Sequence, residues 1–417
     1  MMIAAGALGQ VGGPGGFARA GAGKQVDLSV AGYEAAVKMG RARLKKSVER
    51  LAQMAPGEMP DERFRQMVAV GMEAWDVAEL CQQALDSEVM AKELEEARQM
   101  ANAVPGIKLK TWQDEFQKCV PELRKVAIEN LKQAVAEADE VDGLDEVTFQ
   151  LGYFQSVTGD PAAGAATMKG LLDNHPQSTY VPEAWLMIGE YLFDQQQLAE
   201  ALAAYGQVDK HATARVRPYA KYKSAWCLYN MQEFEKAYEA LLITLDMCGP
   251  GSPWNHLYRE VMRDVAMFYA GLEEAVPENA VGEFQKLDKD NAQAMAQHLA
   301  AVYSDQGKYD DSLNVLEALA TGYPESEKVL DYRRLQVETV ARMGDAEALI
   351  GAAEMLAEAY GERKKSFPPH AKKAAPAIAE MFEGFIANYR TQANKGVPGA
   401  GETAERLGEI LKGMLGK

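Results

Sequence analysis

Cysteine is scarce in this chain of 417 residues, which contains four in all. Cys81, Cys119, Cys227 and Cys248 are widely spaced, without a C-x-x-C pair or a histidine at zinc-binding spacing. This scarcity excludes a disulfide-rich scaffold and a zinc finger. The four residues are interpreted as small buried apolar side chains, while a disulfide between two of them remains open.

Isoleucine, threonine and long apolar runs are also in short supply. No run approaches the ~18 apolar residues that a membrane-spanning helix needs, so no transmembrane segment is expected. Alanine, leucine and glutamate are abundant, which favours helices over strands. The net charge of −17, from 44 basic and 61 acidic residues, argues against a nucleic-acid binder or a coat for anionic membranes. Composition therefore predicts an acidic, all-α protein.

Motifs for catalysis and for cofactor binding are missing as well. The chain has no H-E-x-x-H, no G-x-S-x-G and no G-x-G-x-x-G after a strand. Gly23-Lys24 does not complete a phosphate-binding loop, because Ala18 stands where glycine is needed and Gln25 where a hydroxyl would hold Mg²⁺. The acidic stretch 288–291 lacks the glycine and the distal glutamate of a calcium loop. We expect no enzymatic activity, no cofactor and no metal.

Residues 1–30 are rich in glycine and predict a flexible leader. The first nine are small and apolar, but no basic segment precedes them and the stretch is short for a secretory signal. Two origins stay open: the tail of a longer secretory signal, or a disordered cytoplasmic tail. An intact Met1 or Met2 in mass spectrometry of the native protein would exclude the first.

Residues 31–142 predict a region of long helices. A proline-free stretch from Phe64 to about Ala101 predicts one helix, and the next is expected over 112–140 with an interruption near Pro121. Residues 1–50 carry eight basic and three acidic side chains, which predicts a solvated or ion-pairing face on the first helix. The basic residues on and beside that face are Arg41, Arg43, Lys45, Lys46 and Arg50.

An internal repeat follows, in which a small residue recurs and a second small residue stands twelve positions later. The first members are Gly152, Gly189, Ala225 and Ala300, and the second are Gly164, Ala201, Ala237 and Ser312. The intervals of 37, 36 and 75 residues leave room for one irregular unit near 261–287. This spacing predicts antiparallel helix pairs whose backbones approach at the small residues. Large residues four positions further on are expected to pack against the next unit: Met168, Tyr205, Leu241 and Leu316.

Several units resemble the tetratricopeptide repeat. Residues at the characteristic offsets of that family include Trp185, Ile188, Gly189, Ala201 and Tyr205. The resemblance covers about residues 145–345 and implies a right-handed α-solenoid of helix-turn-helix repeats over 143–360. It also implies that Trp185 packs its helix pair against the preceding one, so that Trp185→Ala would cost about 3–5 kcal/mol if the ring were fully buried.

Two linkers between units, at 175–178 and 323–326, share a proline followed two residues later by serine. The proline closes the preceding helix, and Ser178 and Ser326 are expected to cap the next one. These junctions resemble those of repeat proteins of the bacterial cell envelope, such as the lipoprotein of the outer-membrane β-barrel assembly machinery. The resemblance implies a periplasmic or envelope location, whereas a cytoplasmic location follows if the chain start is genuine.

In tetratricopeptide proteins the first helix of each pair lines a concave groove, so aromatic side chains on those helices are candidate protein-binding residues. The candidates at these offsets are Phe149, Tyr153, Phe193, Tyr222, Trp226 and Tyr229, and the apolar Leu186 stands at an equivalent offset. Packing between units is the alternative for each of them. Because aromatic anchors are common hot spots, Trp226→Ala is expected to weaken partner binding by about 2 kcal/mol. A carboxylate clamp is not indicated, because the residues after the small positions are not asparagine.

Residues 361–417 predict C-terminal capping helices. A proline- and lysine-rich break is expected around 363–376, followed by a helix over 374–389, a flexible joint over 394–401 and a last helix over 403–415. The apolar residues of the last helix lie mostly on one side of it: Leu407, Ile410, Leu411 and Leu415. Docking to a partner is the alternative role of this helix.

The function predicted from these features is a non-enzymatic adaptor or scaffold that binds a protein or peptide segment in its concave groove. The alternative is a structural assembly subunit that forms homo-oligomers through its N-terminal helices. The sequence does not identify the protein partner.

Overall fold

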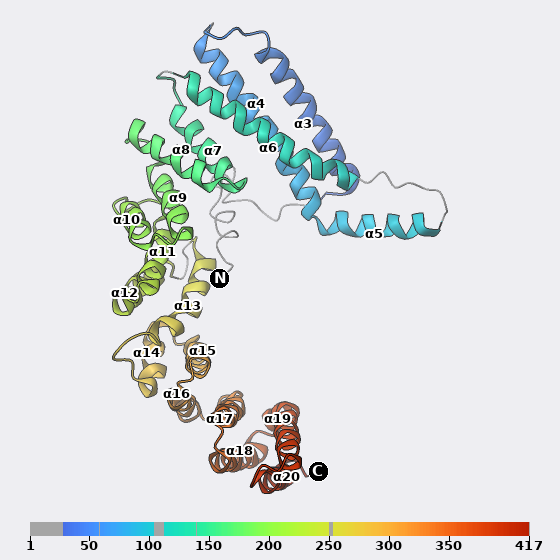
Figure 1. The fold of residues 1–417 in the computed structure, drawn as a ribbon, viewed down its shortest axis with the longest axis vertical. Coiled ribbons are helices and arrows are strands. Elements are labelled where there is room, and N and C mark those ends of the chain that lie inside the picture. Colours follow the sequence, from blue (N-terminus) through green and yellow to red (C-terminus); the bar gives the residue numbers. More distant parts are fainter. Residues whose placement is uncertain (1–27, 58, 104–111, 139, 250–252, 417) are drawn as a thin grey trace. The chain divides into compact units, whose positions relative to one another are not determined.

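The computed structural model describes residues 28–57, 59–103, 112–138, 140–249 and 253–416, and every regular element within those ranges is a helix (Figure 1). The predicted all-α class is therefore confirmed. The chain divides into two compact units, Met1–Ala220 and Lys221–Lys417, and the boundary falls inside helix α11 (Arg217–Asn230). Residues 1–27 of the predicted leader, which include Gly23-Lys24, lie outside the described residues.

Within the described residues, four helices form the N-terminal part of the first unit. They are α3 (Val30–Leu51), α4 (Pro60–Asp86), α5 (Glu88–Ala103) and α6 (Trp112–Glu137). Local chemistry favours these starts, because Ser29 accepts a hydrogen bond from the Gly32 N–H at 3.3 Å and Pro60 opens α4. Helices α3 and α6 both pack on α4, so the core of this region lies along α4.

Two predicted boundaries in this region are wrong. The helix expected from Phe64 to Ala101 is broken at Ser87, whose backbone is extended and whose hydroxyl accepts a hydrogen bond from the Met90 N–H at 3.1 Å. Ser87 thus caps α5, which leaves the line of α4 in Figure 1. Conversely, α6 continues through Pro121, because its packing along α4 outweighs the backbone hydrogen bond that proline removes.

The repeat region consists of successive helix pairs. In the first unit they are α7 (Leu144–Val157) with α8 (Pro161–Asn174) and α9 (Val181–Asp194) with α10 (Leu198–Asp209). Helix α11 is followed by α12 (Phe234–Met247), and the predicted irregular unit consists of α13 (Asn255–Tyr269), the 3-10 helix η1 (Pro277–Asn279) and α14 (Ala280–Leu287). The last two pairs are α15 (Ala292–Asp305) with α16 (Tyr309–Gly322) and α17 (Val329–Met343) with α18 (Ala346–Ser366).

The small residues predicted at a spacing of twelve lie where the two helices of a pair touch. A Cβ atom on Gly164 would come within 2.7 Å of the Gly152 carbonyl oxygen. In a later pair, Ser312 Oγ donates a hydrogen bond to the Ala300 carbonyl oxygen at 2.7 Å. The four large residues expected to fill the space beside them are all at most 1% exposed. These contacts confirm the repeat register.

Each regular pair turns at a residue in the left-handed backbone region. The positions are Gly159, Gln196, Gln232, Gly307 and Gly344, with φ between 60° and 98°. The first four stand seven residues after the first small residue of their unit, so the turn follows the same register as the helix contacts. Glycine adopts this conformation freely, whereas a residue with a Cβ atom is strained in it.

Replacement of Gln232 by glycine is therefore expected to raise the free energy of unfolding by about 0.5–1 kcal/mol, because relief of the strain exceeds the added entropy of the unfolded chain. Urea unfolding followed by circular dichroism measures the change. Met231→Gly is the matched control. Met231 lies in the same turn, but its backbone is not in the left-handed region. A less stable Gln232→Gly protein would show that the glutamine side chain outweighs the strain.

The two linker serines are not the N-caps of the next helices that the sequence predicted, because those positions are Tyr180 and Lys328; instead the serines shape the linkers and connect adjacent elements. Ser178 Oγ and Ser326 Oγ each accept a hydrogen bond from the N–H two residues further on, at 3.1 Å and 3.2 Å. Ser178 donates to Asp145 Oδ2 at 2.6 Å, and Ser326 donates to Gln293 Oε1 at 3.0 Å. Asp145 and Gln293 lie near the starts of α7 and α15, so each linker is tied back to the first helix of the pair before it.

The C-terminal part contains α19 (Pro368–Asn394) and α20 (Ala400–Leu415). The break predicted over 363–376 is confined to Phe367, which alone separates α18 from α19; the expected helix start near 374 is wrong, because α19 begins at Pro368 and contains Pro376. Residues 395–399 form the predicted joint before the last helix. Helix α20 packs on α18 and α19 around the fully buried Leu407, which agrees with the predicted apolar stripe.

Candidate protein-interaction surface

The residues predicted to line a groove lie in different environments. Phe149 on α7 is 2% exposed and stacks on Tyr180 with ring centroids 4.7 Å apart. Leu186 and Tyr222 are also buried, at 2% and 8% exposed, because the helices close over them. The remaining candidates keep part of their surface exposed: Tyr153, Phe193, Trp226 and Tyr229. Of the residues predicted to line a groove, these four alone expose side-chain surface that a partner could contact.

In the second unit, three of the predicted aromatic residues meet on α11. Trp226 makes edge contacts with Tyr222 and Tyr229, at centroid distances of 6.4 Å and 5.8 Å, and with the buried Phe268 of α13 at 5.2 Å. Tyr229 also lies 5.2 Å from Phe234 of α12. Rings from three helices therefore form one aromatic cluster, in which Trp226 and Tyr229 remain partly exposed. The other aromatic candidates, Phe149, Tyr153 and Phe193, belong to the first unit.

A buried carboxylate that the sequence analysis did not predict joins this cluster to α13. Asp264 accepts a hydrogen bond from the Tyr222 hydroxyl at 2.6 Å, and the side chains of Trp226 and Arg263 also reach it. Burial raises the pKa of Asp264, and these three donors oppose the rise. The sequence signal was an acid within the apolar stripe of α13, which contains Leu257, Val261, Val265 and Phe268.

A groove of about 390 Å³ lies between α13 and α15, and one residue of its lining, Arg263, has its Nε atom 3.6 Å from Asp264 Oδ1. Its lining residues are Tyr258, Arg259, Met262, Arg263, Asn291, Ala294, Met295 and His298. Met262 and Met295 are buried and form an apolar floor, whereas Arg259 and Arg263 are exposed. His298 Nδ1 lies 3.0 Å from the Arg263 carbonyl oxygen and donates to it, because a carbonyl only accepts. The groove thus combines adaptable apolar surface with two guanidinium groups.

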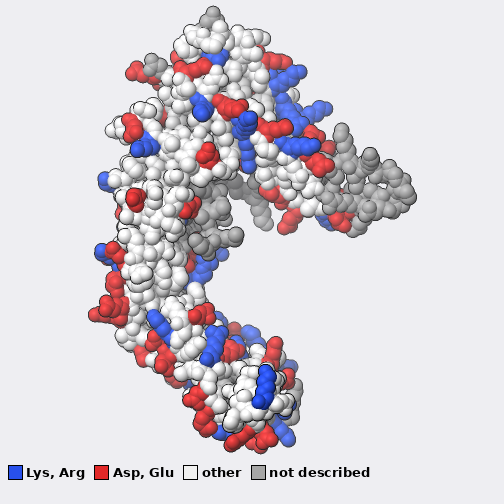
Figure 2. All heavy atoms as spheres, viewed as in Figure 1, with Lys and Arg blue, Asp and Glu red and all other residues white. Residues whose placement is uncertain are grey.

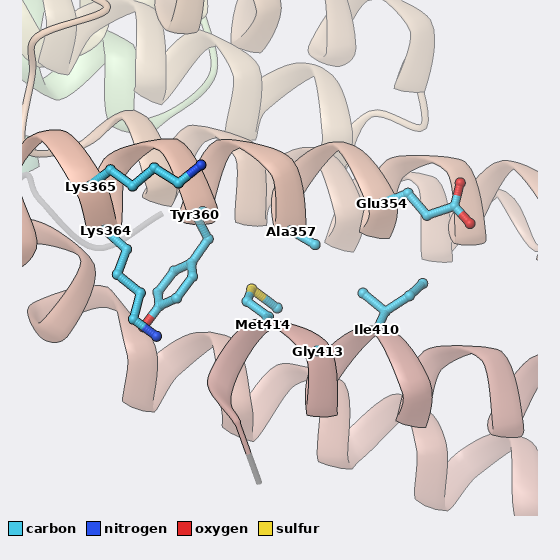
Figure 3. A pocket seen from close by; sticks show the side chains of 9 residues that line it. Glu354, Ala357, Tyr360, Lys364, Lys365, Ile410, Gly413 and Met414 are labelled. Atoms are coloured by element: carbon cyan, nitrogen blue, oxygen red, sulfur yellow. The ribbon is translucent and has the colours of Figure 1, made fainter.

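A second groove, of about 590 Å³, lies between α18 and α20 (Figure 3). Ile410 and Met414 extend from α20 toward α18, and Tyr360, Lys364 and Lys365 of α18 lie at one end of the groove. Neither groove is lined by an aromatic residue predicted from the sequence. The α13–α15 groove is the stronger candidate, because its Arg263 pairs with Asp264, which accepts the hydrogen bond from Tyr222.

Basic side chains gather over α3 in Figure 2, where the sequence predicted a cationic face. Arg41 pairs with Glu115 of α6 at 2.7 Å, and Lys45 Nζ lies 3.8 Å from Glu49. The remaining basic residues of this face are exposed: Arg43, Lys46 and Arg50. The face consists of ion pairs and solvated cations, as predicted.

Within the described residues, no group of three or more histidine, cysteine or acidic side chains is arranged to hold a metal ion. No helix of the described part of the chain is long and apolar enough to cross a bilayer.

The packing of successive helix pairs defines the class as an all-α helical-repeat protein. No protein-family model matches the chain, and no curated protein matches it. One similar solved structure is a circular tandem repeat protein with novel repeat topology and enhanced subunit contact surfaces, at 12% identity and a TM-score of 0.16. The match covers 92% of this chain and 89% of that one. A TM-score this low carries no argument about function.

Proposed function

We propose that this protein is a non-enzymatic scaffold of the tetratricopeptide type, which binds a protein segment with acidic and apolar side chains in the α13–α15 groove. Helical-repeat scaffolds serve protein interaction in general, because stacked helix pairs present an extended surface. The observation that carries the proposal is one groove with methionines at its floor and Arg259 and Arg263 at its surface, where Arg263 also pairs with Asp264, the carboxylate that Trp226 contacts. Tryptophan and arginine are enriched in binding hot spots.

Charge favours an acidic segment as the partner. The chain as a whole is acidic, so a cationic groove attracts an acidic segment locally rather than anions in general. Among the ion pairs of the described residues none involves Arg259, and the neighbour of Arg263, Asp264, already accepts a hydrogen bond from Tyr222. A carboxylate of the partner would complete the hydrogen bonding of these guanidinium groups. Apolar side chains beside it would cover Met262 and Met295.

Selection from a random peptide library displayed against the full-length chain tests the proposal. We expect the selected peptides to combine acidic and apolar residues. Arg259→Glu is expected to weaken binding of a selected peptide by about 2 kcal/mol, roughly 30-fold in Kd, and Trp226→Ala by a similar amount. Fluorescence anisotropy measures the affinity.

Lys289→Glu provides the matched control, because Lys289 is exposed, lies before α15 and does not line the groove. It makes the same charge change and is expected to leave the affinity within about threefold. Selected peptides that bind Arg259→Glu and the unaltered chain equally well would overturn the proposal. A lower melting temperature of Trp226→Ala with unchanged peptide affinity would restrict Trp226 to a packing role.

Homo-oligomerisation through the N-terminal helices stays a prediction. Light scattering of the full-length chain measures its mass directly, and a stable oligomer would favour the assembly role.

A further inference from the structure

Two thiols from separate helices meet in the N-terminal region of the first unit. Cys81 of α4 and Cys119 of α6 are 0% and 3% exposed, and their Sγ atoms are 2.7 Å apart. This separation is longer than a disulfide bond of about 2.05 Å and shorter than an ordinary contact between two sulfur atoms. The helices that carry them pack against each other along their length, so the two side chains are held at this position.

A guanidinium group lies beside one of the two sulfurs. Arg41 of α3 contacts the Cys119 side chain and also donates to Glu115 Oε1 at 2.7 Å. The pKa of the Cys119 thiol is lowered, first because Cys81 donates a hydrogen bond to its thiolate and then because Arg41 is close. Burial and Glu115 oppose this effect. Tyr33 of α3 belongs to the same buried cluster as the two cysteines.

The other two cysteines have a different setting. Cys227 and Cys248 belong to the second unit. Burial alone raises the pKa of the Cys248 thiol to about 11, so this residue is protonated at neutral pH. Because a thiolate is the reactive form of cysteine, Cys119 is expected to be more reactive than Cys248.

We propose that Cys81 and Cys119 are an oxidation site, at which a peroxide converts the two thiols into a reversible disulfide between α4 and α6. The Cys119 thiolate attacks one peroxide oxygen, the O–O bond breaks, and a sulfenic acid and hydroxide result. Cys81 then gives up its proton and attacks the Cys119 sulfur, so that the S–S bond forms, the S–O bond breaks and water leaves. Two thiols and hydrogen peroxide thus yield one disulfide and two waters, with the sulfurs oxidised and the peroxide oxygens reduced.

Treatment of the full-length protein with hydrogen peroxide, followed by peptide mapping without reduction, tests the proposal. We expect one cross-linked peptide pair, which joins Cys81 to Cys119. The number of thiols titrated in denaturant should fall from four, the number of free cysteines, to two. The melting temperature of the first unit should rise by at least about 5 °C, because the bond closes a loop of 38 positions, and dithiothreitol should reverse the rise. Four remaining thiols, or a cross-link through Cys227 or Cys248, would overturn it.

Variants of the cationic neighbour separate reactivity from packing. Arg41→Gln is expected to slow disulfide formation several-fold at pH 7, and the difference should shrink as the pH rises and the thiol ionises without help. Arg43→Gln is the matched control, because Arg43 is exposed on the same helix. In Cys81→Ala, dimedone should trap a sulfenic acid on Cys119. Equal rates for the Arg41 and Arg43 variants at every pH would overturn the role of Arg41.

Discussion

Replacement of Trp75 by alanine is expected to lower the free energy of unfolding of the first unit by about 3–5 kcal/mol. The Trp75 ring of α4 is 8% exposed and stacks on Phe154 of α7, with centroids 3.6 Å apart and planes 5° from parallel. The guanidinium group of Arg124 on α6 also lies over the Trp75 ring, 5.4 Å from its centroid. Arg124 pairs with Glu79 at 2.9 Å. Removal of the indole would leave a cavity where the long helices meet the first repeat. Urea unfolding followed by circular dichroism measures the loss.

Trp185→Ala is the matched control for that experiment. The sequence predicted a loss of 3–5 kcal/mol at Trp185 if its ring were fully buried, but the ring is only partly buried against the cluster of Phe149 and Met168. We therefore expect a smaller loss, about 1–2 kcal/mol, because part of the ring already contacts water. A loss of under about 1 kcal/mol at Trp75, or a larger loss at Trp185 than at Trp75, would contradict this assignment.

The second large effect is expected at a glycine. Gly164→Ala should destabilise the first unit by about 1–3 kcal/mol, although alanine is the better helix former by about 1 kcal/mol. Its Cβ atom would lie 2.0 Å from Ser156 Oγ and 2.7 Å from the Gly152 carbonyl oxygen. The serine side chain could rotate away, but the carbonyl belongs to the backbone of α7, so the two helices would have to separate.

Gly170→Ala on the same helix is the control, because a Cβ atom at Gly170 would meet nothing within 4 Å. We expect this variant to be as stable as the unaltered chain or up to about 1 kcal/mol more stable. Ser156→Ala combined with Gly164→Ala should recover part of the loss, since it removes the closer contact and leaves the backbone contact. Equal melting temperatures for the two single glycine variants would show that α7 and α8 do not meet at Gly164.

The candidate site could be predicted in part. The spacing of Tyr222, Trp226 and Tyr229 predicted one aromatic patch on α11, and the three rings do lie together. Their partner Asp264 follows 42 positions after Tyr222, so no local pattern links the two residues. The same is true of the groove, because Arg259 and His298 come together only across the irregular unit between α13 and α15.

The sequence by itself determined the all-α class, the helix pairs and their register, because these depend on residues within one repeat. Gly152 and Gly164 stand twelve positions apart, and a single turn brings them into contact. Only the tertiary structure decided how α4 docks on α7, which cysteines approach each other and where basic and apolar side chains share a groove. Cys81 and Cys119 are brought together by the packing of α6 along α4, and Trp75 and Phe154 by the contact of α4 with α7. Such packing depends on the whole helix surface, which the local period of a sequence does not encode.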